Sequence, residues 1–251
     1  MKQPALLKII AGFIILFCCY HAAEYMMLFK NSSDGFLLLS FVFFIVAWLV
    51  AKWQGLEGLS AWGIVANRKA WKQLGMGLLA GGIVYGVYFL TSLALDIDRI
   101  KEVPPPGAFI SQFLLFTLGT FFSSLSEDVF IRGYLYRYLH GKIHPYSLIA
   151  LSSLVYLLNH IYRLGDGPGF WFYIFIIGVF LMLAMVRTGN IWLTLGLHWA
   201  GNIVYHTTHS VMHTEAGKGN FPGNTLYILF LLLLIPVTYF ISKHKNQTQA
   251  G

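Results

Sequence analysis

Charged residues are scarce in this sequence of 251 residues. Asp, Glu, Lys and Arg make up 11% of it and hydrophobic residues 57%, whereas a soluble domain carries about 25% charged residues. This balance excludes a soluble globular domain and indicates a protein that crosses a membrane several times. Lys and Arg outnumber Asp and Glu by 17 to 10. Most of that excess lies in short loops, where basic residues set membrane topology, so it does not indicate a nucleic-acid partner.

Cysteine is almost absent, and several motifs of known hydrolases are missing. The two cysteines, Cys18 and Cys19, are adjacent in an apolar run and there is no Cys-x-x-Cys, so neither a disulfide framework nor a thiolate zinc site is indicated. No serine lies in a Gly-x-Ser-x-Gly setting, which argues against a serine nucleophile. His-Glu-x-x-His is also absent, which excludes a zincin metalloprotease.

Long apolar runs fill most of the chain and predict an all-α fold in one domain, 1–251, with about eight transmembrane helices. The run after Met1 is long for a signal peptide, so we expect a retained first span. Glycines in the third run suit close helix packing. Segment 53–73 mixes aromatic and basic residues, which suits either an amphipathic segment on the membrane surface or an ordinary basic loop. The expected spans are 6–28, 36–50, 74–95, 108–140, 146–162, 170–186, 191–213 and 225–242.

Basic residues are distributed unequally between the two sides that this topology defines. Eight spans place both termini on one side, with about ten basic residues there against one acidic residue, Glu57. The positive-inside rule therefore predicts that both termini face the cytoplasm. The basic residues on that side are Lys2, Lys52, Arg68, Lys69, Lys72, Arg137, Lys142, Arg187, Lys243 and Lys245.

Ionisable residues interrupt the fourth span at Glu127, Asp128 and Arg132. A charge at the centre of a membrane helix costs roughly 2.5–3.5 kcal/mol on insertion scales, so such residues usually have a function. Asp128 and Arg132 lie four apart and are expected to pair, whereas Glu127 points about 100° away around the helix. The ordinary alternative is a helix end that leaves the membrane, where charge is common.

Two further polar groups occur within the apolar runs. Tyr156 and His160 lie one turn apart in the fifth span, and His198 and Asn202 one turn apart in the seventh. Counted from the neighbouring turns at 1.5 Å per residue, Glu127 and His160 lie at matching heights of roughly 21 and 22 Å, but His198 at only about 12 Å. A tilted seventh span, or a turn sunk below the membrane surface, would remove this mismatch.

A carboxylate, two imidazoles and an amide at similar depth suit the hydrolysis of an amide bond. Glu127 is expected to take a proton from water that His160 holds. His198 and Asn202 are expected to stabilise the oxyanion. Each residue also has an ordinary structural explanation: a histidine bonded to a neighbouring carbonyl group, an asparagine between helices, or an arginine that sets topology.

Three motifs in order resemble those of the CPBP intramembrane proteases, bacterial relatives of the type II CAAX prenyl endopeptidase. They are Glu127-Asp128-x-x-x-Arg132, Tyr156-x-x-x-His160 and His198-x-x-x-Asn202, and they fall within about 75 residues; the resemblance covers 109–205. The family pattern has a second Glu at position 128 and Phe at position 156. Because this sequence has Asp and Tyr at these two positions, we expect supporting roles for Asp128 and Tyr156, and also for Arg132, which pairs with Asp128.

The resemblance implies an eight-helix fold around a water-filled polar cavity in a bacterial plasma membrane. It also implies that Glu127 and His160 activate water, and that His198 and Asn202 form the oxyanion hole. The expected substrate is a membrane protein, a lipid-anchored protein or a secreted peptide, and no nucleic-acid partner is expected. Glu127, His160 and His198 would be the ligands of any zinc ion. Because asparagine is a poor fourth ligand, we expect a metal-free mechanism without a cofactor.

Two other functions fit the same sequence. A non-catalytic immunity factor or scaffold would keep the fold, and the change of Glu to Asp at position 128 leaves that open. A transporter that relays protons is disfavoured because the sequence has no inverted repeat. His206, His209 and His213 extend the helical face of His198 and Asn202. They are expected to form either a metal or proton path or simply a His-rich helix end.

Overall fold

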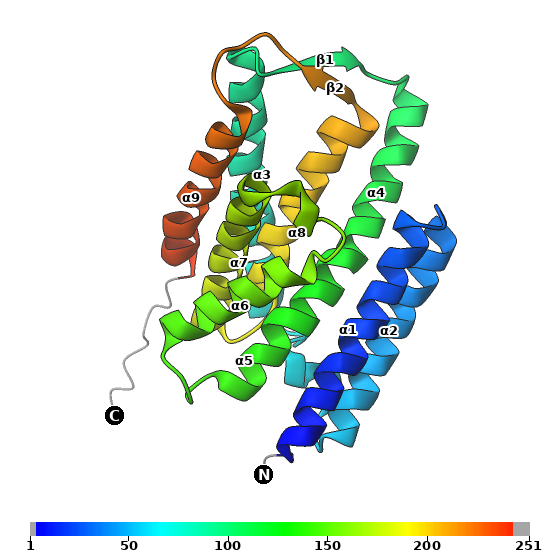
Figure 1. Cartoon of the computed structure of the whole chain (residues 1–251), viewed down its shortest axis with the longest axis vertical. Coiled ribbons are helices and arrows are strands. Elements are labelled where there is room, and N and C mark those ends of the chain that lie inside the picture. The colour runs from blue at the N-terminus through cyan, green and yellow to red at the C-terminus, as the bar shows by residue number, and fades with distance from the viewer. Residues whose placement is uncertain (1–3, 243–251) are drawn as a thin grey trace.

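The chain folds as a bundle of helices (Figure 1), described by a computed structural model over residues 4–242. The predicted all-α membrane fold is confirmed. Lys2, Lys243 and Lys245, used above to predict topology, lie outside the described residues. The main helices are α1 (Leu6–Leu28), α2 (Ser33–Trp53), α3 (Arg68–Ala94), α4 (Pro106–Glu127), α5 (Tyr134–Leu139), α6 (Pro145–Asn159), α7 (Pro168–Thr188), α8 (Trp192–His206) and α9 (Gly223–Ile241). Between them lie 3₁₀ turns at Gly58–Trp62 and Leu164–Asp166, π-helical turns at Asp128–Gly133 and Thr207–Val211, and strands β1 (Asp98–Glu102) and β2 (His213–Ala216).

Six helices in residues 4–242 are long and apolar enough to cross a membrane. One of them is the continuous rod Pro106–Leu139, in which α4, a π-helical turn and α5 follow one another without a break. Of the remaining two, α6 has 15 residues and is therefore about 22 Å long, short of the roughly 30 Å hydrocarbon thickness. Helix α8 also has 15 residues but continues without a break into the π-helical turn Thr207–Val211. The fifth span thus ends earlier than the sequence predicts, whereas the helical run 192–211 nearly matches the predicted seventh span.

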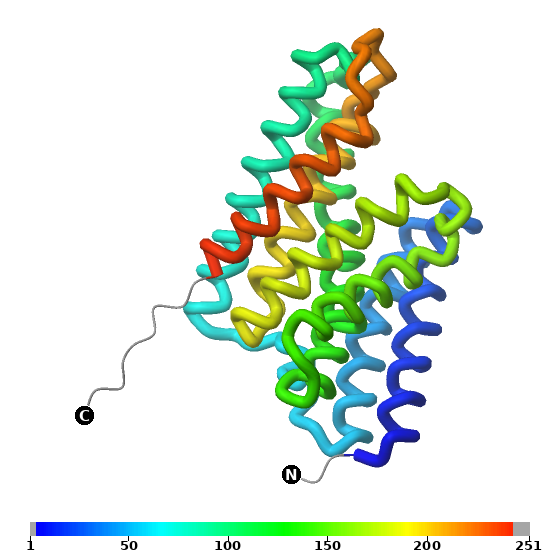
Figure 2. The backbone as a smooth tube through the Cα atoms, turned by 60° about the vertical axis from the view of Figure 1, so that its left-hand side comes forward, coloured from blue at the N-terminus to red at the C-terminus, as the bar shows by residue number. Residues whose placement is uncertain are grey.

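The rod of α4 and α5 divides the bundle (Figures 1 and 2). The α1–α2 hairpin lies on one side, and α3, α7, α8 and α9 lie on the other. In both views, the turn between α6 and α7 ends short of the strand pair β1–β2. The beginning of α1 and the end of α9 lie toward the opposite end of the molecule from these strands (Figure 1).

Helices α3 and α8 pack with their backbones in close contact. A Cβ atom added at Gly77 would lie 2.9 Å from the Cα of Gly196, and one added at Gly81 would lie 2.8 Å from the Cβ of Ala200. Small residues permit such an approach without a clash. Gly75 faces open space, so the expected packing role holds for only part of the glycine set.

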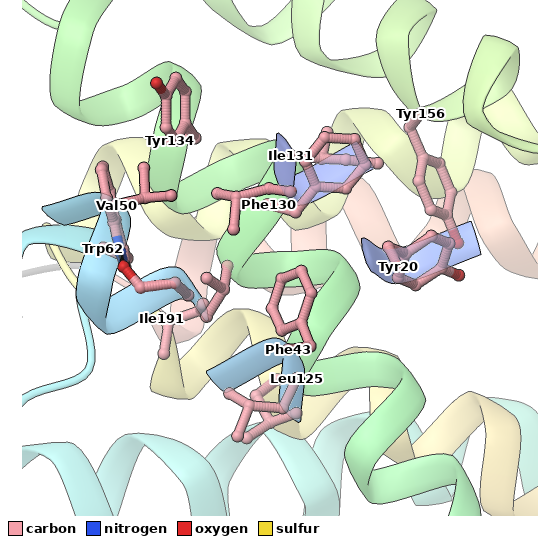
Figure 3. Close-up of a cluster of buried hydrophobic side chains, with 14 of the residues drawn as sticks. Tyr20, Phe43, Val50, Trp62, Leu125, Phe130, Ile131, Tyr134, Tyr156 and Ile191 are labelled. Atoms are coloured by element: carbon pink, nitrogen blue, oxygen red, sulfur yellow. Dashed lines mark hydrogen bonds between the residues drawn. The ribbon is translucent and has the colours of Figure 1, made fainter. Parts of the chain in front are cut away.

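The segment between α2 and α3 contains the 3₁₀ turn Gly58–Trp62, which inserts a tryptophan into the core while Glu57 and Ser60 stay exposed. Neither an amphipathic segment on the membrane surface nor an ordinary basic loop predicts this insertion. Trp62 is completely buried, and its indole N–H donates to the Ala47 carbonyl at 2.9 Å. A Cβ atom at Gly133 would lie 2.3 Å from the Trp62 carbonyl oxygen, so only glycine permits this approach. Figure 3 shows Trp62 at one end of the main core cluster, with Tyr20 and Tyr156 at the other.

Strands β1 and β2 pair antiparallel, with Asp98 opposite Ala216. This pair ties the α3–α4 connection to the α8–α9 connection. Asp96 stands just before β1 in a left-handed conformation (φ 54°). Its carboxylate accepts hydrogen bonds from Arg99 and from the backbone N–H of Lys218, and the bond from Arg99 holds the pKa of Asp96 below its ordinary value.

Candidate active site

A π-helical turn carries the first motif. Asp128 and Arg132 are both fully buried in it, and Arg132 Nη1 lies 3.1 Å from Asp128 Oδ1, so the predicted ion pair is present. The guanidinium also lies 3.8 Å from the ring centroid of Tyr156, an arrangement that stabilises a cation against an aromatic face. The pair thereby connects the π-helical turn to α6.

The Glu127 carboxylate, at the end of α4, is 5% exposed. Its Oε1 atom accepts hydrogen bonds from the Tyr20 hydroxyl and from Asn159 Nδ2, each at 3.1 Å. Its Oε2 atom lies 3.5 Å from His198 Nε2. Three helices, α1, α6 and α8, therefore hold the two oxygens of one carboxylate at fixed positions.

His198 lies between the two adjacent carboxylates. While Nε2 faces Glu127, Nδ1 lies 3.3 Å from Asp128 Oδ1. The expected height mismatch is absent because the turn before α8 is sunk into the protein: Ile191 is fully buried, and its N–H donates to the Gly63 carbonyl at 3.2 Å. The 58–63 turn thus sets the depth at which α8 begins.

His160 caps the C-terminal end of α6 without a direct hydrogen bond to Glu127. Its Nδ1 lies 2.8 Å from the Tyr156 carbonyl oxygen, which has no proton to give, so Nδ1 carries a proton. In the neutral imidazole, Nε2 is then the acceptor. The side chain through which α6 contacts Glu127 is Asn159, the residue before it.

Asn202 lies one turn after His198, and its Nδ2 donates to Ser124 Oγ at 2.9 Å. This bond uses one of the two amide N–H groups and leaves the other for a further acceptor. Ser124 is itself fully buried, one turn before Glu127 and Asp128. Asn202 therefore docks α8 on α4 immediately beside the carboxylates.

A cavity of about 370 Å³ opens next to these side chains. Tyr156, His160, His198 and Asn202, all singled out from the sequence, line it together. Glu127 is not part of the lining itself, but its carboxylate contacts His198, which is. Most of the other lining side chains are aromatic or polar, and the full remainder is Tyr85, Tyr88, Arg163, Tyr173, Ile174, Ile177, Gly201, Tyr205, His206, His209, Asn224 and Tyr227.

Of the remaining histidines, His206 and His209 lie on the cavity wall with His198 and Asn202, whereas His213 does not. His206 stacks on Phe116 with ring centroids 5.0 Å apart, and His209 stacks on Tyr205 at 4.7 Å. The π-helical turn Thr207–Val211 then breaks the α-helical phase. His213 lies in β2 and is exposed, so the prediction that it shares the face of His198 is wrong.

Residues 4–242 contain no group of three or more His, Cys, Asp or Glu side chains arranged to hold a metal ion. Oε1 of Glu127 already accepts two hydrogen bonds, and both nitrogens of His198 face carboxylates. Nδ1 of His160 is engaged by a carbonyl. The three side chains named above as ligands of any zinc ion therefore do not fit such a site.

Sequence reasoning missed the side chains that hold Glu127 from outside the motifs. Tyr20 and His21 belong to α1, and His21 Nε2 lies 3.1 Å from Asn159 Oδ1. The sequence contained a signal for this contact, because Tyr20 and Glu24 are polar residues four apart, with His21 between them, in a mostly apolar span. The sequence does not indicate that this face of α1 points toward α4 and α6.

Fold and site together define a polytopic membrane protein with ionisable side chains gathered inside its bundle. Residues 109–204 match the model of the family described as Rce1-like, type II CAAX prenyl endopeptidase Rce1-like. This match covers 96 of the 251 residues and supports an assignment of the chain to the CPBP/CAAX protease family. A search of curated proteins gives no match.

Proposed function

We propose that this protein is an intramembrane endopeptidase that hydrolyses a peptide bond with water activated by Glu127. The observation that supports this most is the buried carboxylate of Glu127, held by Tyr20 and Asn159 and adjacent to His198 on the wall of a cavity. A carboxylate fixed in this way is suited to take a proton from water at a defined position.

His160 orients the attacking water in this mechanism. With Nδ1 bound to the Tyr156 carbonyl, its Nε2 accepts a hydrogen bond from that water. Glu127 takes the other proton as the oxygen attacks the peptide carbonyl, and it returns this proton to the leaving nitrogen when the C–N bond breaks. No metal ion takes part in these steps.

His198 and Asn202 line the cavity where the carbonyl oxygen of the substrate would lie. The free N–H of Asn202 donates to the oxyanion that forms. His198 contributes a second donor once the nitrogen that lies 3.5 Å from Glu127 turns from that carboxylate toward the oxyanion. Asp128 and Arg132 hold the π-helical turn, and Tyr156 supports the guanidinium. In this proposal Glu127 is the general base, and the adjacent Asp128 has a structural role.

A comparison of membrane proteomes tests the proposed proteolysis and identifies the substrate. The two strains compared carry either the wild-type protein or Glu127→Ala. We expect a membrane-associated or secreted protein to accumulate as an uncleaved precursor in the variant strain and to disappear when the wild-type gene is restored. Equal levels of every precursor in the two strains would contradict proteolysis and favour a non-catalytic immunity factor or scaffold.

We further propose that the termini face the cytoplasm of a bacterial cell and that the cavity opens toward the opposite face. The cavity lining includes Arg163, just past the end of α6, and Asn224, at the start of α9. Both residues lie at helix ends opposite to the side of the bundle that carries the excess of basic residues. The described basic residues on that side are Lys52, Arg68, Lys69, Lys72, Arg137, Lys142 and Arg187. The scissile bond would then lie in the extracytoplasmic half of the membrane.

Cysteine labelling of intact cells tests this orientation. In a background with Cys18→Ala and Cys19→Ala, a membrane-impermeant maleimide should label Lys218→Cys, which lies between β2 and α9. The matched variant Lys52→Cys should react only after the cells are lysed. The reverse pattern would place the cavity on the cytoplasmic side.

A further inference from the structure

Helix α1 contributes a polar cluster that reaches Glu127 from outside the matched segment 109–204. It consists of Tyr20, His21 and Glu24, of which Tyr20 and His21 are about 95% buried, with exposures of 5% and 6%. Three polar side chains in an apolar membrane helix are costly unless each is paired. All three are paired here, and two of them act on the surroundings of one carboxylate.

Tyr20 makes the direct contact. Its hydroxyl donates to Glu127 Oε1 at 3.1 Å, with Glu24 Oε1 slightly farther away at 3.3 Å. The hydroxyl has one proton and so donates to one carboxylate at a time, and Glu127 is the nearer acceptor. Its ring stacks on Phe130 with centroids 5.9 Å apart, which fixes the direction of the hydroxyl (Figure 3).

His21 acts through Asn159. Nε2 of His21 donates to Asn159 Oδ1 at 3.1 Å, and Nδ1 lies 2.7 Å from Glu24 Oε2. With its oxygen occupied by His21, the Asn159 amide directs Nδ2 at Glu127 Oε1. The two routes from α1 therefore converge on the same oxygen atom of Glu127.

We infer that Tyr20 is a positioning residue for the reaction: with the His21–Asn159 pair it holds Oε1 of Glu127, so that Oε2, beside His198, is the oxygen that takes the proton from water. This inference rests on the proposed function. It assigns distinct roles to the two carboxylate oxygens, and it makes the α1 helix part of the catalytic apparatus although α1 lies outside the matched segment.

Tyr20→Phe tests the assignment, because it removes the hydroxyl and keeps the ring against Phe130. With the precursor identified from the Glu127→Ala strain as substrate, kcat should fall about 10- to 100-fold, the range expected for losing one hydrogen bond to a charged group, while KM stays unchanged. Tyr25→Phe is the matched control: Tyr25 lies on the same helix, is 43% exposed, and its loss should leave both constants unchanged. An unaltered kcat in Tyr20→Phe would overturn the inference.

A second measurement separates this inference from the proposed function. Thermal unfolding in detergent is compared for Tyr20→Phe in the wild-type and Glu127→Ala backgrounds. We expect the substitution to lower the Tm of the wild-type protein but not that of Glu127→Ala, because the bonded partner is then already gone. Equal shifts in the two backgrounds would refute the contact, whereas absence of any cleaved substrate, with the coupling intact, would refute the proteolytic function alone.

Discussion

Purified Glu127→Gln protein is expected to remain folded and to lose cleavage of its substrate by about 10²- to 10⁴-fold, the usual contribution of a general base. The glutamine side chain has nearly the same shape, and its carbonyl oxygen still accepts from Tyr20 and Asn159. It cannot take up a proton from water at neutral pH. The initial cleavage rate and the Tm in detergent measure the two expectations separately.

Two controls accompany this experiment. Glu57→Gln makes the same chemical change at an exposed position between α2 and α3 and should leave the cleavage rate unchanged. Wild-type protein treated with a strong chelator should also keep its rate, since the proposed mechanism uses no metal ion. Reversible inhibition by the chelator would contradict that mechanism, and full activity of Glu127→Gln would exclude Glu127 as the base.

Arg132→Leu is expected to destabilise the protein by about 3–5 kcal/mol, because it leaves the fully buried Asp128 carboxylate without its cation. The change also removes the guanidinium from the face of Tyr156. Arg163→Leu is the matched control. That arginine similarly pairs with an aspartate, Asp166 at 2.9 Å, and lies over the Phe170 ring, but half of its side chain is exposed, so its loss should cost about 1 kcal/mol or less.

The double variant Asp128→Asn with Arg132→Leu distinguishes the cause of the loss. It removes both charges, so it should be more stable than Arg132→Leu alone. Unfolding by denaturant in detergent gives both values. If the double variant is less stable than the single one, the cost arises from lost packing against Tyr156 and not from an uncompensated charge.

Local sequence features predicted the parts of the fold that depend on neighbouring residues. The apolar run 6–28 coincides with α1, and the i, i+4 spacing of Asp128 and Arg132 forms the expected ion pair. Both follow from hydropathy and helical periodicity alone. The contact between Tyr20 and Glu127 joins residues 107 positions apart, and no local pattern encodes which face of α1 meets α4.

The depth of His198 could not be predicted because the count of residues assumed that the turn before α8 lies at the membrane surface. Asn190 and Ile191 are instead buried against the 58–63 turn. Segment 53–73 resembled a surface segment because its tryptophans, Trp53 and Trp62, occur near basic residues such as Lys52, Arg68 and Lys69. Hydropathy does not distinguish an indole at the membrane interface from one inserted into the core, as Trp62 is.

The π-helical turn Asp128–Gly133 makes the site depend on residue number as well as residue type. Such a turn contains one residue more than α-helical geometry accommodates, so it shifts the phase of the rod by about 100° between its two halves. Deletion of a single residue from this turn would therefore restore a regular α-helix. Glu127 would then turn away from His198 even though every side chain of the candidate site remained in the sequence.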